Sequence, residues 1–238
     1  MVRDLVRRWG KGWPSVVLLG AAYGIYEEGI AVRSFFDPTW PDLDRLAVYG
    51  RWLGVNWVWA EWLTIYHAIV SITIPILLVE LLYPRRRDDP WLNKPGWIVC
   101  GILFLAYVAF GPLVGMQAPI VGLLGCVVAM GMLAWAAYRW PLPGEADIKR
   151  VHPFKPGWFI GLGFLWMLGE FLIFGVLPST SLPPLVTMLQ GIGLCLLVAA
   201  VAWAMGGRSW TDRHRWALAF GVLLVCCLLY TSDAADEE

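Results

Sequence analysis

The sequence predicts an all-α bundle of transmembrane helices, because its composition is strongly apolar and its charges are clustered. Of the 238 residues, 59% are apolar or aromatic and only 15% are charged, whereas a soluble domain is typically about 45–50% apolar and about 25% charged. The charges fall in short clusters between apolar runs of roughly 20 residues, the length that a helix needs to cross a bilayer. Backbone groups in hydrocarbon must be paired within their own segment, so these runs are expected to be helices. The composition excludes a soluble enzyme, a nucleic-acid binder, a disordered chain and a disulfide scaffold.

We expect one integral membrane domain over residues 1–226, with about seven spans, of which the last is incomplete. Pro75 and Pro112 lie inside expected spans, where a missing N–H and a ring clash should kink the helix. The spans cover approximately residues 13–35, 53–82, 96–117, 119–139, 157–178, 182–206 and 214–226.

The C-terminal segment, residues 227–238, reads CLLYTSDAADEE. Its beginning matches a transposase-type sequencing adapter translated in frame, so we expect the segment to be an artefact rather than native sequence. The native chain would then be a fragment that breaks off inside a hydrophobic segment near Cys226.

The basic residues predict the orientation. Fifteen of the 18 Lys and Arg residues lie on one side, before the first expected span or in and beside the loops that follow the even-numbered spans. The other three are Arg33, Arg45 and Arg51. Because basic loops stay in the cytoplasm, the N-terminus is expected to be cytoplasmic and the seventh span to run outward. The expected location is a prokaryotic plasma membrane.

Ionisable side chains inside a bilayer are costly, and they mark functional sites or buried pairs. Glu80 lies one turn from the cytoplasmic end of its span, beside Arg85–Arg87, and we expect it to extend towards water. The other ionisable residues within the spans are the candidate ligand-binding residues: Glu27, Glu28, Glu61, His67 and Glu170.

The depth of each candidate follows from the helical rise of about 1.5 Å per residue. Glu27 and Glu28 lie roughly 21–23 Å from the cytoplasmic face, and Glu170 lies roughly 18 Å from it. Counted from the outer face, Glu61 lies about 14 Å down and His67 about 23 Å. We therefore expect three helices to present carboxylates at a similar depth, with His67 nearer the cytoplasm.

Three of the acids share a helix face with an aromatic residue four positions earlier, towards which a helical side chain leans. A phenol O–H or indole N–H could donate a hydrogen bond to the acid, and the ring faces could hold a cation. In a chain with 14% aromatic residues, such pairs also arise by chance. The pairs are Tyr23 with Glu27, Trp57 with Glu61, and Trp166 with Glu170.

The first expected helix carries its two acids on different faces. Gly20, Gly24 and Glu28 repeat every four residues, a small-residue stripe suited to close helix contact, so Glu28 should face the bundle. Glu27 points about 100° away from Glu28 on an α-helix, so we expect the two carboxylates to lie in different environments. At least one of them should be protonated or paired, and Arg33 is the nearest candidate cation.

His67 shares a helix face with Ser71 and Pro75. Pro75 has no N–H, so it frees the carbonyl of Ser71 for another partner. His67 could pair with Glu27 or Glu28, or it could shuttle protons, because an imidazole exchanges protons near neutral pH. A packing histidine is the alternative.

The stretch Glu27-Glu28-Gly-Ile-Ala-Val-Arg33, followed by Leu63-Thr-Ile-Tyr-His67, resembles the first two motifs of the intramembrane glutamate proteases that process prenylated proteins and bacteriocins. That family carries Glu-Glu, three residues, Arg; then Phe, three residues, His; then a later His, three residues, Asn. The resemblance, over about 41 residues, implies that Glu27 activates a water molecule that His67 helps to hold. In this chain four residues separate Glu28 from Arg33, Leu63 replaces the Phe, and no third motif follows in a later span. The expected depth is also on the outer side, whereas that family opens to the cytoplasm.

The favoured interpretation is a multi-pass protein that binds or moves protons or a small, cationic solute through the Glu, His and aromatic residues. A hydrolase with Glu27, Glu28 and His67 as catalytic residues is the second interpretation. An accessory subunit whose buried charges contact a membrane-protein partner is the third. We expect the lipid bilayer as the surrounding partner, no nucleic acid, and no cofactor. A metal ion or haem is also not expected, because His152 and His214 are placed in cytoplasmic loops.

Overall fold

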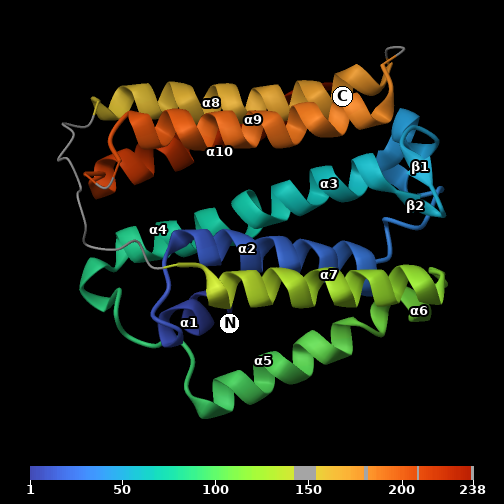
Figure 1. The fold of residues 1–238 in the computed structure, drawn as a ribbon, viewed down its shortest axis with the longest axis horizontal. Helices are drawn as coiled ribbons and strands as arrows, with labels where there is room; N and C mark the ends of the chain where they lie inside the picture. The colour runs from blue at the N-terminus through green and yellow to red at the C-terminus, as the bar shows by residue number, and fades with distance from the viewer. Residues whose placement is uncertain (142–153, 180–181, 208, 237–238) are drawn as a thin grey trace. The chain divides into compact units, whose positions relative to one another are not determined.

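The structure is a computed structural model that describes residues 1–141, 154–179, 182–207 and 209–236 (Figure 1). The described residues are mostly helical and form two compact units, Met1–Pro143 and Gly144–Glu238. The residues Lys149, Arg150, His152 and Arg208, which the sequence analysis assigns to cytoplasmic loops, lie outside the described residues.

The first unit consists of helical segments and one two-stranded hairpin. The segments η1 and η3 are π-helical turns that continue the α-helix before them, and η2 and η4 are short 3-10 helices. The elements are α1 (Val2–Arg8), α2 (Trp13–Gly24), η1 (Ile25–Ala31), η2 (Pro41–Ala47), β1 (Arg51–Trp52), β2 (Val55–Asn56), α3 (Trp57–Tyr66), η3 (His67–Thr73), α4 (Ile74–Leu82), η4 (Pro84–Arg86), α5 (Lys94–Tyr107), α6 (Phe110–Leu113) and α7 (Ile120–Arg139).

Four helices among the described residues are long and apolar enough to cross a membrane: Trp57–Leu82, Ile120–Arg139, Pro156–Val176 and Pro184–Ala204. They correspond to the expected spans 53–82, 119–139, 157–178 and 182–206. The expected spans 13–35, 96–117 and 214–226 overlap the helices α2 (Trp13–Gly24), α5 (Lys94–Tyr107) and α10 (Asp212–Asp236). That these three also cross the membrane stays a prediction.

The second expected span begins later than predicted, because residues 51–56 form a hairpin. Arg51 pairs with Asn56, and Trp52 pairs with Val55. The two residues of the turn between them, Leu53 and Gly54, have φ values of 52° and 76°. Positive φ at both positions is typical of the type I′ turn that joins antiparallel strands most tightly. The helix then starts at Trp57, capped by Asn56.

The two internal prolines act differently. Helix α5 stops at Tyr107, five residues before Pro112, and Pro112 itself lies in the short helix α6. The ring of a proline clashes with the carbonyl four residues earlier, here that of Val108, which explains why α5 breaks at that point. Pro75 does not break its helix, because the π-helical turn η3 comes directly before α4 and absorbs the altered hydrogen bonding.

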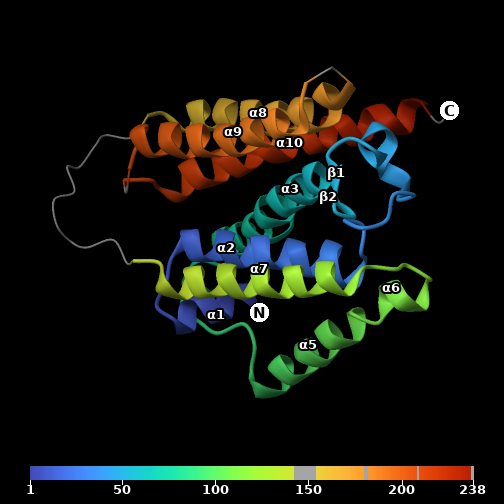
Figure 2. The same ribbon diagram turned by 45° about the vertical axis from the view of Figure 1, so that its right-hand side comes forward.

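Helix α2 is the centre of the first unit, where it packs against α3 and η3 and also against α7 (Figure 2). Ser15 of α2 is fully buried and donates to the carbonyl of Ala137 in α7 at 2.8 Å. Helix α1, which the sequence analysis did not predict, covers the start of α2 through Val6 and Trp9. These contacts hold the start of α2 against α1 and α7.

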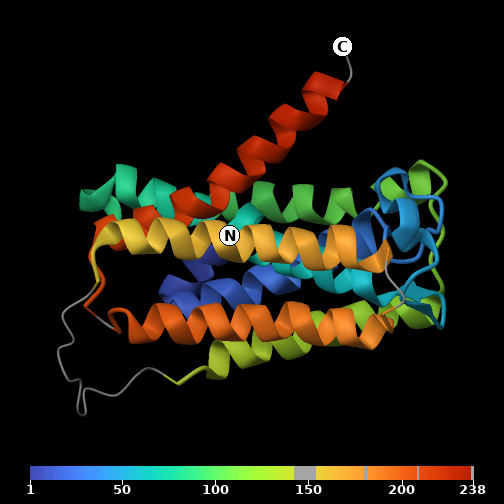
Figure 3. The same cartoon turned by 90° about the horizontal axis from the view of Figure 1, so that it is seen from above.

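The second unit comprises α8 (Pro156–Phe171), the π-helical turn η5 (Leu172–Val176), η6 (Leu177–Ser179), α9 (Pro184–Ala204) and α10 (Asp212–Asp236). Helix α10 crosses α8 closely, and its C-terminal part extends past α8 and α9 (Figure 3). A Cβ atom on Gly163 would lie 2.2 Å from the carbonyl oxygen of Leu218, and one on Gly221 would lie 2.1 Å from that of Ile160. Glycine at both crossing points is what lets the two backbones approach.

Candidate functional site

Three residues of the expected site lie in π-helical turns of the first unit. Glu27 and Glu28 are in η1, and His67 is the first residue of η3. In such a turn an N–H bonds to the carbonyl five residues earlier, as Val32 does to Glu27 at 2.7 Å. These turns are rare in α-helices and occur frequently at functional sites.

His67 lies between the two carboxylates, with one ring nitrogen facing each. Its Nδ1 is 3.3 Å from Oε2 of Glu27, and its Nε2 is 3.1 Å from Oε1 of Glu28. The exposed fractions of the side chains are 11% for His67, 21% for Glu27 and 12% for Glu28. We call these three residues the Glu-His-Glu cluster. The arrangement joins two acids through one base.

Hydrogen bonds fix the Glu27 side of the cluster. The Oγ atom of Ser71 lies 3.0 Å from Nδ1 of His67, one turn along the same helix. The hydroxyl of Tyr23 donates to Glu27, and the ring of Tyr23 packs edge-on against that of His67 with 6.0 Å between centroids. The two side-chain pairs that helical spacing predicts, Tyr23 with Glu27 and His67 with Ser71, are therefore in contact in the structure.

Two residues that sequence reasoning missed hold the Glu28 side. Ser34 is fully buried and donates to Oε2 of Glu28 at 2.5 Å. The indole N–H of Trp59 donates to the same serine oxygen at 3.1 Å. Neither helical spacing nor composition marks Ser34, because only the turn that follows η1 folds it back over Glu28.

The small-residue stripe brings the helices together at the cluster. A Cβ atom on Gly24 would lie 3.0 Å from Cβ of His67, and one on Gly20 would lie 2.9 Å from the carbonyl oxygen of Ala68. The stripe therefore packs against η3 as its spacing predicts. Glu28, one turn further on, contacts His67.

Two expectations about this region are wrong. Glu27 and Glu28 do not lie in separate environments, because η1 is wider than an α-helix and His67 lies between both side chains. His67 is not nearer the cytoplasm than the two acids but beside them. The depth of His67 was overestimated since the helix starts at Trp57, ten residues or about 15 Å before His67.

Arg33 does not pair with Glu27 or Glu28, in contrast to the expectation from the sequence. Within the described residues it forms no ion pair, and its guanidinium donates to the carbonyl of Met116 at 3.0 Å. Its φ of 66° turns the chain at the end of η1. The basic side chain that contacts the two carboxylates is that of His67 and not that of Arg33.

Glu61 and Trp57 lie near the beginning of α3. Glu61 is half-buried and four residues, or about 6 Å, inside the helix, well short of the expected 14 Å. Trp57 is 42% exposed, and its indole N–H donates to the carbonyl of Trp52 at 3.1 Å. The hydrogen-bonding group of Trp57 is thus directed to the hairpin and not to Glu61, in contrast to the expected pairing.

Glu170 belongs to the second unit and has an environment of its own. It is fully buried near the end of α8, and its Oε1 accepts from Sγ of Cys195 in α9 at 3.1 Å. The indole of Trp166 also donates to this carboxyl, as their spacing predicts. Whether Glu170 acts together with the Glu-His-Glu cluster stays a prediction.

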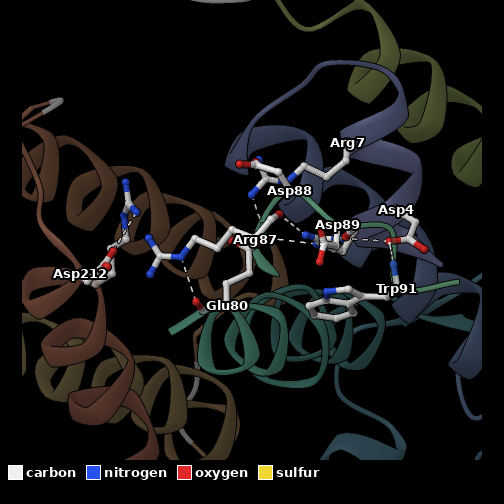
Figure 4. Close-up of polar contacts among 10 residues, drawn as sticks. Asp4, Arg7, Glu80, Arg87, Asp88, Asp89, Trp91 and Asp212 are labelled. Atoms are coloured by element: carbon white, nitrogen blue, oxygen red, sulfur yellow. Dashed lines mark hydrogen bonds and ion pairs between the residues drawn. The ribbon is translucent and has the colours of Figure 1, made fainter. Parts of the chain in front are cut away.

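Glu80 does not extend into water as expected but is 7% exposed in a network at the end of α4 (Figure 4). Its Oε1 accepts hydrogen bonds from Nε of Arg3 at 3.2 Å and from a terminal nitrogen of Arg7 at 2.9 Å. Arg3 is 3% exposed, donates to Asp4 and to the carbonyls of Arg87 and Asp89, and lies over a tryptophan ring. The network ties α1 to the end of α4, so its role is structural.

Asp4 completes this network from the other side. It accepts the backbone N–H groups of Trp91 at 3.1 Å and Leu92 at 2.8 Å (Figure 4). Burial acts to raise the pKa of Asp4, but these two donors and Arg3 lower it by more, so its pKa lies below the ordinary value of 3.8. The carboxylate therefore stabilises the folded state while it is ionised.

His214 is in the first turn of α10 and not in a loop. It is 5% exposed, accepts the N–H of Thr211 at Nδ1, and lies with Nε2 2.9 Å from the carbonyl of Phe154. Both ring nitrogens are occupied by these contacts, so His214 joins the start of α10 to the segment before α8.

Comparison with known proteins gives a family but no characterised relative. Neither the curated proteins nor the solved structures contain a match to this chain. The match to the family extends over residues 1–235 and so includes most of segment 227–238, whose artefactual origin stays a prediction. The apolar helices and this match agree that the chain is an integral membrane protein. It belongs to an uncharacterized membrane protein family.

Proposed function

We propose that the chain is a multi-pass transport protein that binds and moves protons through the Glu-His-Glu cluster. The observation that carries the proposal is that each ring nitrogen of His67 faces a different carboxylate, at 3.3 Å and 3.1 Å. Chains of Asp, Glu and His inside a membrane are the usual groups of proton relays in pumps and transporters.

The geometry suits proton transfer without movement of the backbone. An imidazole can take up a proton on one nitrogen and release a different proton from the other. A proton that arrives at Glu27 can enter the ring at Nδ1, while Nε2 delivers a proton to Glu28. Ser34, which donates to Glu28 at 2.5 Å, holds that carboxylate in position to receive it.

The charge of the cluster favours uptake of a further cation. With both carboxylates ionised and the imidazole protonated, the cluster would carry a net charge of −1, which is costly in an enclosed membrane site. One additional proton makes the cluster neutral, and a monovalent solute cation would have the same effect. The aromatic ring of Tyr23 and the half-buried acid Glu61 would then line the path towards the outer face, with Trp57 at its entrance.

The topology that goes with this function has seven spans, a cytoplasmic N-terminus and a prokaryotic plasma membrane as location. The support is the distribution of Lys and Arg. Single cysteines introduced at Asp88 and at Thr39, in a chain without its own cysteines, should differ in reaction with an impermeant maleimide added to intact cells. Labelling at Thr39 and not at Asp88 is expected, and the reverse pattern would contradict the orientation.

The test of the function is a proton flux measurement. The purified chain is reconstituted into vesicles that contain a pH-sensitive dye, and a pH gradient is imposed with the membrane potential clamped. Wild type should dissipate the gradient, whereas Glu28→Gln and His67→Asn should slow the flux by about 100-fold, the loss typical of a missing proton-transfer group. Asp88→Asn, the same chemical change at a side chain that is 96% exposed, should match wild type. A wild-type flux equal to that of empty vesicles would contradict the proposal.

Hydrolysis is a second candidate, favoured by one observation. The two sequence motifs that resemble the intramembrane glutamate proteases are brought into contact, with Glu27 and Glu28 against His67. A hydrolase would cleave membrane peptides in vesicles and lose this activity in Glu27→Gln. Proton flux without any cleavage product, detected by mass spectrometry, would favour the transport function over hydrolysis.

A further inference from the structure

Glu170 is fully buried in the second unit, and no positively charged side chain contacts it among the residues that the structure describes. Its exposed fraction is 0%. In α8 it is the one charged residue, and neither η5 nor α9 contains any Asp, Glu, Lys, Arg or His. The charged residues of α10 lie in its first turn and near its C-terminal end. The titratable group that faces Glu170 from a neighbouring helix of this unit is the thiol of Cys195.

The two oxygens of the Glu170 carboxyl are not equivalent. Oε1 accepts the S–H of Cys195 at 3.1 Å, and the indole of Trp166 donates to the same carboxyl. Oε2 is buried and has no hydrogen-bond partner among the described residues. An ionised carboxylate would leave a buried, partly unsatisfied charge here, which is unfavourable even after the protein relaxes.

We propose that Glu170 is a proton-binding site of its own, held as a neutral carboxylic acid with its proton on Oε2. This inference is independent of the Glu-His-Glu cluster and goes beyond the proposed function, because it assigns a second proton site to the other unit. The donor from Cys195 fixes Oε1 as the carbonyl oxygen. The proton on Oε2 remains available for transfer to an incoming base.

The position in the helix supports this assignment. Glu170 comes just before the π-helical turn η5, and a π-helical turn also holds the acids of the first unit. A Cβ atom on the preceding residue, Gly169, would lie 2.7 Å from the side chain of Leu194, so α8 and α9 are in close contact beside Cys195. The close contact keeps the thiol and the carboxyl within hydrogen-bond distance.

The test is infrared spectroscopy of the full chain in lipid at neutral pH. The difference spectrum of wild type minus Glu170→Gln should contain the C=O stretching band of a protonated carboxylic acid. Cys195→Ala should shift this band to higher frequency, because the carbonyl oxygen loses a donor. Cys195→Ser, which keeps a donor, should not. Carboxylate bands in place of the acid band would overturn the proposal. An acid band whose frequency is the same in Cys195→Ala as in the wild-type chain would also overturn it.

Thermal unfolding gives a second readout that does not depend on the spectrum. Gln is neutral and of the same size as Glu, so Glu170→Gln should unfold at the wild-type temperature. Glu80→Gln is the matched control, because Glu80 pairs with two arginines and its neutralisation should lower the unfolding temperature. A loss of stability in Glu170→Gln as large as that in Glu80→Gln would show that Glu170 is an ionised, paired group and would contradict the proposal.

Discussion

The Nε2 atom of His67 lies 3.1 Å from Oε1 of Glu28, although the two residues are 39 positions apart in the chain. The contact depends on two features of the first unit. Gly20 and Gly24 let α2 approach η3 closely, and the π-helical turns direct the side chains towards each other. The contact between His67 and Glu28 therefore depends on the close packing of α2 against η3.

Substitution at the crossing of α8 and α10 should affect stability strongly. A Cβ atom at Gly163 would lie 2.2 Å from a backbone oxygen, so Gly163→Ala must force the helices apart, at a cost of about 1–3 kcal/mol. At Gly161, two positions away in the same helix, nothing lies within 4 Å of an added Cβ atom. Gly161→Ala should leave the unfolding temperature unchanged or raise it. Equal behaviour of the two variants in detergent melts would contradict the observed crossing.

Removal of Arg3 should release α1. The side chain of Arg3 is 3% exposed and pairs with Asp4 and Glu80, so Arg3→Met leaves buried carboxylates with fewer partners. Loss of one member of a buried pair costs about 3–5 kcal/mol. Arg8, on the same helix, is exposed and lies over the ring of Trp97, and Arg8→Met should cost about 1 kcal/mol or less. Chemical denaturation of the two variants measures the difference.

The network around Asp4 should make stability fall in acid. Since the pKa of Asp4 is lower in the folded state than its ordinary value of 3.8, the unfolded chain binds this proton more tightly. The contribution of Asp4 is complete above its unfolded pKa and is lost as the pH falls through its folded pKa. Unfolding temperatures measured from neutral pH down to about pH 3 should decline less in Asp4→Asn than in wild type. Parallel curves would show that Asp4 is not the titrating group.

A substitution in the turn of the hairpin at residues 51–56 should raise the stability of that hairpin. Leu53 has a φ of 52°, which is strained for a residue that carries a Cβ atom, and it is 73% exposed, so little packing is lost when it is replaced. Leu53→Gly should raise the stability of the hairpin by about 1 kcal/mol. Gly54→Ala should lower it, because the residue at 54 also needs a positive φ, 76°. Protease resistance of the segment 37–56 reports both effects.

This hairpin illustrates where sequence reasoning fails. In sequences, type I′ turns are recognised by the pairs Asn-Gly and Asp-Gly. The first turn residue here is Leu53 and not Asn or Asp, so the sequence predicts that residues 53–56 belong to a membrane span. The four long apolar helices agree with the predicted spans, because long apolar runs have few alternatives in a bilayer. The break before Pro112 follows from a local rule, whereas the hairpin depends on contacts such as the hydrogen bond from Asn56 to the carbonyl of Leu46.

The sequence indicates candidate residues by their type but not by their arrangement. The cost of charge in a membrane makes Glu27, Glu28, Glu61, His67 and Glu170 candidates from sequence alone, and their function stays a prediction. That both acids reach one imidazole could not be predicted, because it depends on π-helical turns that tertiary packing stabilises. Ser34 had no signal at all, since it acts through a turn and not through helical spacing.

The central claim is that His67 exchanges protons with both carboxylates, and nitrogen NMR of the imidazole tests it most directly. The chain contains three histidines, so the signals of His67 in the labelled protein are assigned by comparison with His67→Asn. Glu27→Gln should shift mainly the Nδ1 signal and Glu28→Gln mainly the Nε2 signal, with a change in the protonated fraction of the ring in both. If neither substitution changes either nitrogen signal, His67 is not coupled to the two acids, and the proposed proton path is wrong.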